Sequence, residues 1–147
     1  MDLALATPQA APTPRNDPPS ALALPPLVTV IEDESIVLAG YQMLFESWGF
    51  RVVAATSSDE AVSALHTTAS IPDLILADYR LKDERTGVQA IRHLQTLFGQ
   101  GIPGILITGD SYIEQLRDAA SSGFPILHKP VKSPQLRALI NQYLPGK

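Results

Sequence analysis

The chain has no cysteine. Disulfide bonds, thiolate metal sites and cysteine nucleophiles are therefore excluded. No apolar run approaches the ~18 residues that a membrane-spanning helix requires, so we expect no membrane insertion. Lysine and arginine form no block and the formal net charge is −4, so electrostatic nucleic-acid binding is not expected. We expect a cytoplasmic protein whose partners are other proteins or small ions.

Proline is concentrated at the N-terminus, where residues 1–26 contain seven of the 13 prolines together with many alanines. This composition predicts a disordered or polyproline-rich arm. The acidic start and the early prolines argue against a cleavable secretory signal. Residues 27–147 then have the length and apolar content of one domain.

From Leu27 onward, short apolar runs alternate with helical patterns. The apolar runs predict five buried strands, at residues 27–31, 51–54, 74–77, 105–107 and 125–128. A helical pattern follows each strand. Alternation of this kind predicts an α/β protein with a single five-stranded parallel sheet and helices on both faces. We expect the flavodoxin-like strand order 2-1-3-4-5.

Helix signals in the sequence predict caps and buried faces. Ser57 with Glu60 predicts a capping box, and Ser133 is the predicted N-cap of the last helix, with Pro134 at its first position. Leu97 and Tyr143 fall on predicted buried stripes. The helix after the first strand is predicted to bury one face, made by Ile36, Val37, Gly40, Tyr41, Leu44, Phe45 and Trp48.

Polar side chains follow four of the five predicted strands. Glu32 and Asp33 come after the first, Asp78 after the third, Thr108 after the fourth and Lys129 after the fifth. Because the carboxyl ends of parallel strands meet at one edge of the sheet, we expect these side chains to converge on one crevice.

Three carboxylates in one crevice repel one another unless a cation joins them. With oxygen ligands only, the cation should be hard, meaning Mg²⁺ or Mn²⁺. Lys129 can neutralise a phosphoryl oxygen, and the Thr108 hydroxyl can donate a hydrogen bond to another. This set fits phosphoryl transfer with one carboxylate as the nucleophile.

The spacing of Glu32-Asp33, Asp78, Thr108 and Lys129-Pro130 resembles the receiver domain of two-component response regulators, including the kind found in hybrid sensor histidine kinases. The resemblance covers about residues 27 to 144. It implies that Asp78 is the phosphoacceptor and that Thr108 and Lys129 hold the phosphoryl group. It also implies a cis Lys129-Pro130 peptide bond.

The same resemblance implies a metal site. Asp33 and Asp78 would bind Mg²⁺, Glu32 would assist directly or through water, and the backbone carbonyl of Arg80 would be a further ligand. The implied function is a phosphorylation-controlled switch that assists its own phosphorylation and dephosphorylation but is not an enzyme in the usual sense.

The implied partners are proteins. The phosphoryl donor would be a histidine kinase or a phosphotransfer protein, and the output would pass to a downstream protein on the face made by the fourth helix, fifth strand and fifth helix. Tyr112, Arg117 and Arg137 are candidate residues of that face.

The sequence departs from the family pattern around the site. The loop after Asp78, residues 81–87, lacks the usual proline and is one residue longer. The position of the aromatic switch residue holds Ile126, and Phe124 stands two residues earlier. We also hypothesise that Arg80 and Asp110 pair over the site and modulate access of the hydrolytic water.

Two other classes of function remain open. One is a Mg²⁺-dependent phosphohydrolase with an aspartate nucleophile, although Arg80 stands where such enzymes usually have a second acid. The other is a receiver-like interaction module that never carries phosphate. Flavin or nucleotide binding is less favoured, because no phosphate-cradling glycine-rich loop follows the first strand. The histidines His66, His93 and His128 are interpreted as solvated or packed residues.

Overall fold

The computed structural model describes residues 24–82, 85–109 and 113–144. Only residues 24–26 of the predicted N-terminal arm fall within these ranges. Asp110 and Tyr112, which the sequence singled out, lie outside them.

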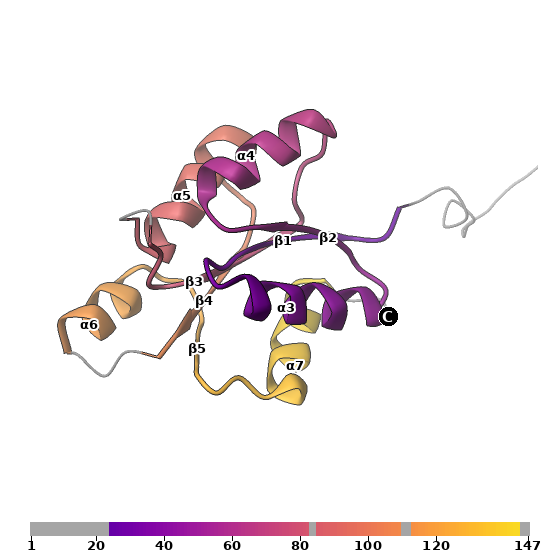
Figure 1. The fold of residues 1–147 in the computed structure, drawn as a ribbon. Helices are drawn as coiled ribbons and strands as arrows, with labels where there is room; N and C mark the ends of the chain where they lie inside the picture. Colours follow the sequence, from indigo (N-terminus) through magenta and orange to yellow (C-terminus); the bar gives the residue numbers. More distant parts are fainter. Residues whose placement is uncertain (1–23, 83–84, 110–112, 145–147) are drawn as a thin grey trace, which may run out of the picture.

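Within these ranges, five strands alternate with five helices (Figure 1). The sheet is parallel, in the order β2-β1-β3-β4-β5, which confirms the predicted fold class and strand order. The strands are β1 (Leu27–Ile31), β2 (Arg51–Ala55), β3 (Leu74–Asp78), β4 (Gly104–Thr108) and β5 (Ile126–His128). The helices are α3 (Ser35–Ser47), α4 (Ser58–Thr67), α5 (Gly87–Phe98), α6 (Ile113–Ser121) and α7 (Ser133–Tyr143).

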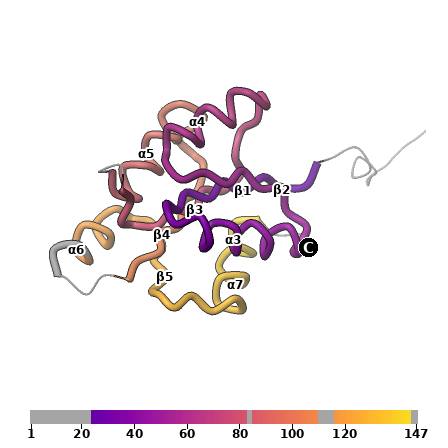
Figure 2. The backbone as a smooth tube through the Cα atoms, viewed as in Figure 1, coloured from indigo at the N-terminus to yellow at the C-terminus, as the bar shows by residue number. Residues whose placement is uncertain are grey.

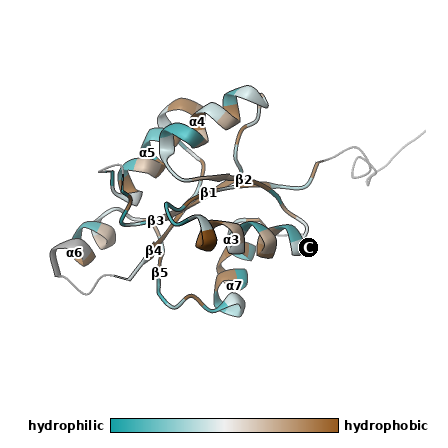
Figure 3. Cartoon of the chain, viewed as in Figure 1, coloured by the Kyte–Doolittle hydropathy of each residue, from teal (hydrophilic) through white to brown (hydrophobic). Residues whose placement is uncertain are grey.

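Helices cover both faces of the sheet, with α4 and α5 on one face and α3 and α7 on the other (Figures 1 and 2). Side chains of β1 alternate between two core clusters. Val28 and Val30 pack with α3 and α7, whereas Leu27 and Ile31 pack with α4 and α5. The strands β1, β3 and β4 are buried at every position because helices cover both faces of the sheet. Figure 3, which colours each residue by hydropathy, shows hydrophobic residues at the centre of the molecule.

The strand register aligns the carboxyl ends of four strands. Ile31 of β1 is paired with Ala77 of β3, Asp78 with Ile107 of β4, and Thr108 with His128 of β5. The residues that follow these positions consequently emerge at one edge of the sheet.

The predicted face of the first helix was wrong in part. Ile36 is 87% exposed and Gly40 is also exposed, whereas Leu38 and Phe45 are the buried side chains of α3. Residues 36–38 are three consecutive apolar residues, and only one of them can point straight at the sheet in a helix with 3.6 residues per turn. Leu97 and Tyr143, predicted as buried, are 47% and 37% exposed at the last turns of their helices.

Of the two predicted N-caps, Ser57 is confirmed, whereas the N-cap of the last helix lies one residue before the predicted Ser133. The Ser57 hydroxyl accepts from the Glu60 backbone N–H, as predicted, but the Glu60 carboxylate accepts from Thr56 instead of completing the box at Ser57. The last helix already begins at Ser133, so Lys132 occupies the N-cap position and Pro134 lies in the first turn.

Candidate functional site

Three carboxylates meet at the carboxyl edge of the sheet. Glu32 and Asp33 follow β1 and Asp78 ends β3, and one oxygen from each lies within 4.8 Å of the others. Glu32 is 1% exposed and Asp78 is 8% exposed. Glu32 and Asp33 lie beside Asp78 because β1 and β3 are direct neighbours in the sheet.

Lys129 brings the positive charge to this cluster. Its Nζ donates a hydrogen bond to Oδ2 of Asp78 at 3.1 Å. The backbone N–H of Lys129 donates to the carbonyl of Thr108 at 2.8 Å, so the end of β5 stays aligned with the end of β4. The Lys129-Pro130 peptide bond is cis.

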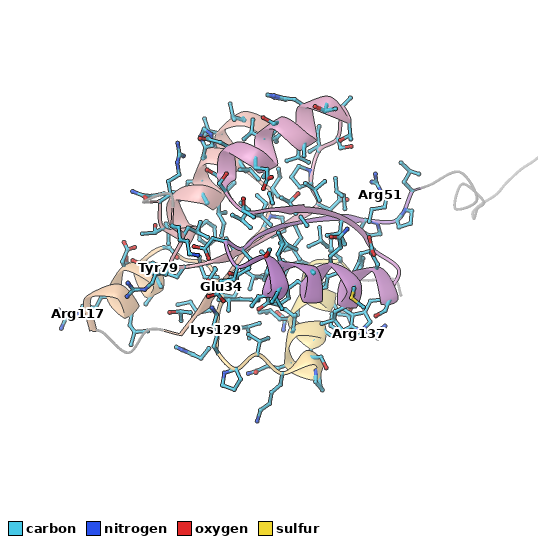
Figure 4. All side chains as sticks on the ribbon, in the orientation of Figure 1. Glu34, Arg51, Tyr79, Arg117, Lys129 and Arg137 are labelled. Carbon is cyan, nitrogen blue, oxygen red and sulfur yellow. The ribbon has the colours of Figure 1, made fainter. Side chains whose placement is uncertain are left out.

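The cluster opens into a cavity of about 380 Å³. Figure 4 labels Glu34 and Lys129, which both border it. Thr108 and Glu32 are buried at the same strand ends but are not among the residues that line the cavity. The lining consists of Asp33, Glu34, Asp78, Arg80, Leu81, Lys82, Gly109 and Lys129.

Burial dominates the electrostatics of the acidic cluster. It raises the pKa of Glu32 from its ordinary value of 4.5 to about 7, and the negative charge of Asp78 adds to the rise. Burial also raises the pKa of Asp78, although the hydrogen bond and charge of Lys129 oppose this. Burial lowers the pKa of Lys129, but the contact with Asp78 outweighs that effect and leaves it above its ordinary value.

A hard divalent cation fits these residues. Oε2 of Glu32 accepts from the backbone N–H of Glu34, but Oε1 is buried and has no hydrogen-bond partner among the described residues. A buried carboxylate oxygen without a partner is costly, and a cation bound by the cluster would remove that cost. The donors are all oxygens, which suits Mg²⁺ or Mn²⁺.

Of the other predicted site residues, Arg80 is beside the acidic cluster and two lie against the apolar core. Arg80 borders the cavity, and its backbone forms an isolated bridge with Thr86. Phe124 and Ile126 are partly buried and pack against the core on the α4 and α5 side. The predicted pairing of Arg80 with Asp110 cannot be placed, since Asp110 lies outside the described residues.

Sequence reasoning missed several contacts of the site. Glu34 and Lys82 border the cavity, and Gly87 packs so closely under β3 that a Cβ there would lie 2.5 Å from the carbonyl oxygen of Asp78. Tyr79, directly after Asp78, donates a hydrogen bond from its hydroxyl to Asp118 of α6. The acidic run Glu32–Glu34 was a signal for Glu34, but nothing in the local sequence indicated that Tyr79 contacts Asp118.

Residues 28–141 match the family model described as the response regulator receiver domain. The chain belongs to this family. Receiver domains are signalling domains of two-component systems, and they typically bind Mg²⁺ through acidic residues like those gathered here. No helix in the described ranges is long and apolar enough to cross a membrane.

Curated relatives include two longer regulators. The transcriptional regulatory protein ZraR of Klebsiella oxytoca is 26% identical over 118 residues, which make up 80% of this chain and 26% of ZraR. The phyllosphere-induced regulator PhyR of Methylorubrum extorquens is 28% identical over 80% of this chain and 43% of PhyR. The chain thus spans less than half the length of these relatives.

Solved structures with a similar fold include isolated receivers. A response regulator receiver protein from Pseudomonas putida is 27% identical with a TM-score of 0.70, over 82% of this chain and 98% of that one. The anti-anti-sigma factor PhyR from Bartonella quintana is 29% identical with a TM-score of 0.65, over 84% of this chain and 49% of that one.

Proposed function

We propose that this receiver is a cytoplasmic switch that accepts a phosphoryl group on Asp78 from a histidine kinase or a phosphotransfer protein, in a Mg²⁺-dependent reaction. The observation that supports this most is the position of Asp78. Its carboxylate stands at the end of β3, borders the cavity, belongs to the acidic cluster and accepts a hydrogen bond from Lys129. No other carboxylate in the described residues combines these four properties.

Metal binding would use the cluster directly. Asp33 and Asp78 would bind Mg²⁺ through their carboxylates, Glu32 would assist directly or through water, and the Arg80 backbone carbonyl would complete the protein ligands. The bound ion would supply positive charge to the phosphoryl oxygens. Because burial raises the pKa of Glu32 to about 7, binding of the ion would release protons from the fraction of molecules in which this carboxyl is protonated.

The transfer itself needs little from the protein beyond positioning. A carboxylate oxygen of Asp78 attacks the phosphorus atom from inside the cavity, an O–P bond forms, and the bond from phosphorus to the donor breaks on the opposite side. The Lys129 ammonium group would shift to a phosphoryl oxygen, since it is already within hydrogen-bond distance of Asp78. The Thr108 hydroxyl would donate to another of these oxygens.

The output would pass to a downstream protein through the surface of α6, β5 and α7. Figure 4 places Arg117 on α6 and Arg137 on α7, and both residues are exposed. The guanidinium of Arg137 lies 5.2 Å from the ring centre of Trp48, so it also contacts the C-cap residue of α3. Of these two arginines, Arg117 is therefore the better candidate for a contact that depends on the state of α6.

Intact mass spectrometry tests the proposal. The protein is incubated with Mg²⁺ and a small acyl phosphate, beside an Asp78→Asn variant and a sample in which a chelator removes the metal. We expect one phosphoryl adduct on the wild-type protein, none on the variant and little without metal. An equal adduct on Asp78→Asn would contradict the assignment, and absence of any adduct from folded, Mg²⁺-bound protein would favour a receiver-like module without phosphate chemistry.

A further inference from the structure

The residue that follows the proposed phosphoacceptor is joined to a distant helix. Tyr79 is 6% exposed, and its hydroxyl donates a 2.7 Å hydrogen bond to Oδ2 of Asp118 in α6. The two residues are 39 positions apart in sequence. A hydrogen bond from a buried hydroxyl to a carboxylate is among the stronger side-chain contacts in proteins.

The backbone of Tyr79 is held on both sides. Its N–H donates to the carbonyl of Ile107 in β4 at 2.7 Å, and its carbonyl accepts from the N–H of Gly87 at the start of α5 at 2.8 Å. Tyr79 therefore provides a fixed anchor one residue from Asp78, and its side chain reaches outward from that anchor to α6.

Helix α6 is an outlying element of the molecule. It stands at the margin of the fold in Figures 1 and 2, and among its residues 116–121 only Ala119 is fully buried. Ala119 and Tyr79 belong to the same core cluster, and Phe124 and Ile126 pack against that cluster. Position 126 has no ring, whereas Tyr79, directly after β3, is an aromatic residue whose hydroxyl links the end of that strand to α6.

Phosphorylation of Asp78 would act differently on the two ends of this connection. Thr108 ends β4 and α6 is the next helix along the chain, so we expect a movement of the Thr108 hydroxyl toward a phosphoryl group to displace α6. The Tyr79 to Asp118 hydrogen bond holds the middle of the same helix to the fixed end of β3. The hydrogen bond thus opposes the displacement.

We propose that Tyr79 is a positioning residue that holds α6 in place while Asp78 is unphosphorylated and releases it when Asp78 carries phosphate. This inference rests on the proposed function, because it names the regulation of that site. A hydrogen bond with a charged partner that is exposed, as Asp118 is, lies at the lower end of the usual range and changes an equilibrium by about tenfold. A bias of this size is enough to move a helix between a mostly held and a mostly released population.

Hydrogen exchange of the α6 amides tests the inference. The wild-type protein, Tyr79→Phe and Tyr143→Phe are each measured with and without excess acyl phosphate and Mg²⁺, and intact mass gives the phosphorylated fraction. Tyr79→Phe removes only the hydroxyl. Tyr143→Phe removes the hydroxyl of a tyrosine on α7 that is 37% exposed, so it is the matched control.

We expect α6 to exchange about tenfold faster in unphosphorylated Tyr79→Phe than in wild type. After phosphorylation the two proteins should exchange alike, and Tyr143→Phe should match wild type in both states. If the Tyr79 hydroxyl had only a structural role, its loss would speed α6 exchange equally in the unphosphorylated and phosphorylated states. That result would overturn the inference, as would no change in exchange at all. If the wild-type protein gains no phosphoryl adduct, the proposed function fails and the coupling fails with it. If it gains the adduct but phosphorylation does not change α6 exchange, only the coupling fails.

Discussion

The ammonium nitrogen of Lys129 lies 3.1 Å from Oδ2 of Asp78, although 51 positions separate the two residues in sequence. Asp78 is nearly buried and shares its cluster with Glu32 and Asp33. Arg80 and Lys82 also border the cavity, but the three clustered carboxylates and Glu34 still outnumber the three basic side chains, so the site has a small excess of negative charge. A divalent cation would offset that excess while leaving Lys129 free to contact a phosphoryl oxygen.

Lys129→Gln should slow phosphorylation of Asp78 by about ten- to a hundredfold, because the variant loses a charged hydrogen-bond donor beside the reacting oxygen. The rate of adduct formation with a fixed concentration of acyl phosphate and Mg²⁺ measures this. Lys132→Gln is the matched control, since Lys132 is exposed and does not line the cavity. Equal rates in Lys129→Gln and wild type would exclude a role for Lys129 in the transfer.

Stability of the metal-free protein should fall as the pH rises from 4.5 toward about 7. Burial raises the pKa of Glu32 to about 7 from an ordinary value of 4.5, so in this window the folded chain retains a proton that the unfolded chain has released. The raised pKa of Asp78 acts in the same direction. Urea unfolding in chelator across this window measures the slope.

Saturating Mg²⁺ should flatten or reverse this dependence, because the ion binds the deprotonated carboxylates and its affinity increases with pH. Glu32→Gln removes one of the titrating groups and should reduce the slope in chelator. A metal-free wild-type protein that becomes steadily more stable across the same pH window would contradict the assigned pKa shift.

Gly87→Ala should destabilise the protein by about 1–3 kcal/mol, because the new methyl group has no room. It would lie 2.5 Å from the backbone oxygen of Asp78 and 2.9 Å from Cδ2 of Leu106. Displacement of β3 should also slow phosphorylation. Gly40→Ala in α3 is the control: nothing lies within 4 Å of its Cβ, and alanine there should stabilise the helix by about 0.5–1 kcal/mol. Denaturant unfolding of the two variants should give shifts of opposite sign.

Two neighbouring residues of α3 test which face of that helix is buried. Leu38→Ala should lower the free energy of unfolding by about 2–5 kcal/mol, since Leu38 is packed against the sheet. Ile36→Ala should change it by no more than about 0.5 kcal/mol, because Ile36 is 87% exposed. Similar losses in both variants would mean that α3 is rotated from the orientation described.

The fold was predictable because each strand is a short, mostly apolar run that is flanked by polar or turn-forming residues. The first four residues of β3, Leu74 to Ala77, are all apolar and buried, a pattern typical of a short strand that is covered on both faces. The phase of α3 was not predictable in detail. Residues 36–38 are all apolar, so the pattern around them is compatible with more than one rotation, and packing against the sheet selected Leu38.

The close approach of Glu32, Asp33 and Asp78 was predictable for a related reason, since polar residues directly after parallel strands share one edge. The Tyr79 to Asp118 contact was not. It depends on where α6 lies relative to the sheet, and the residues between Thr108 and α6 have no pattern that fixes that placement. The roles of Asp78, Thr108 and Lys129 in phosphoryl transfer remain predictions.

Borohydride reduction of the phosphorylated protein, followed by peptide sequencing with mass spectrometry, tests the central claim most directly. An aspartyl phosphate is a mixed anhydride, and borohydride converts it to the side-chain alcohol, homoserine. The account predicts homoserine at position 78 alone, formed only when Mg²⁺ and acyl phosphate were both present. Reduction at Asp33 or Glu32, or a phosphoryl adduct that leaves Asp78 unreduced, would contradict it.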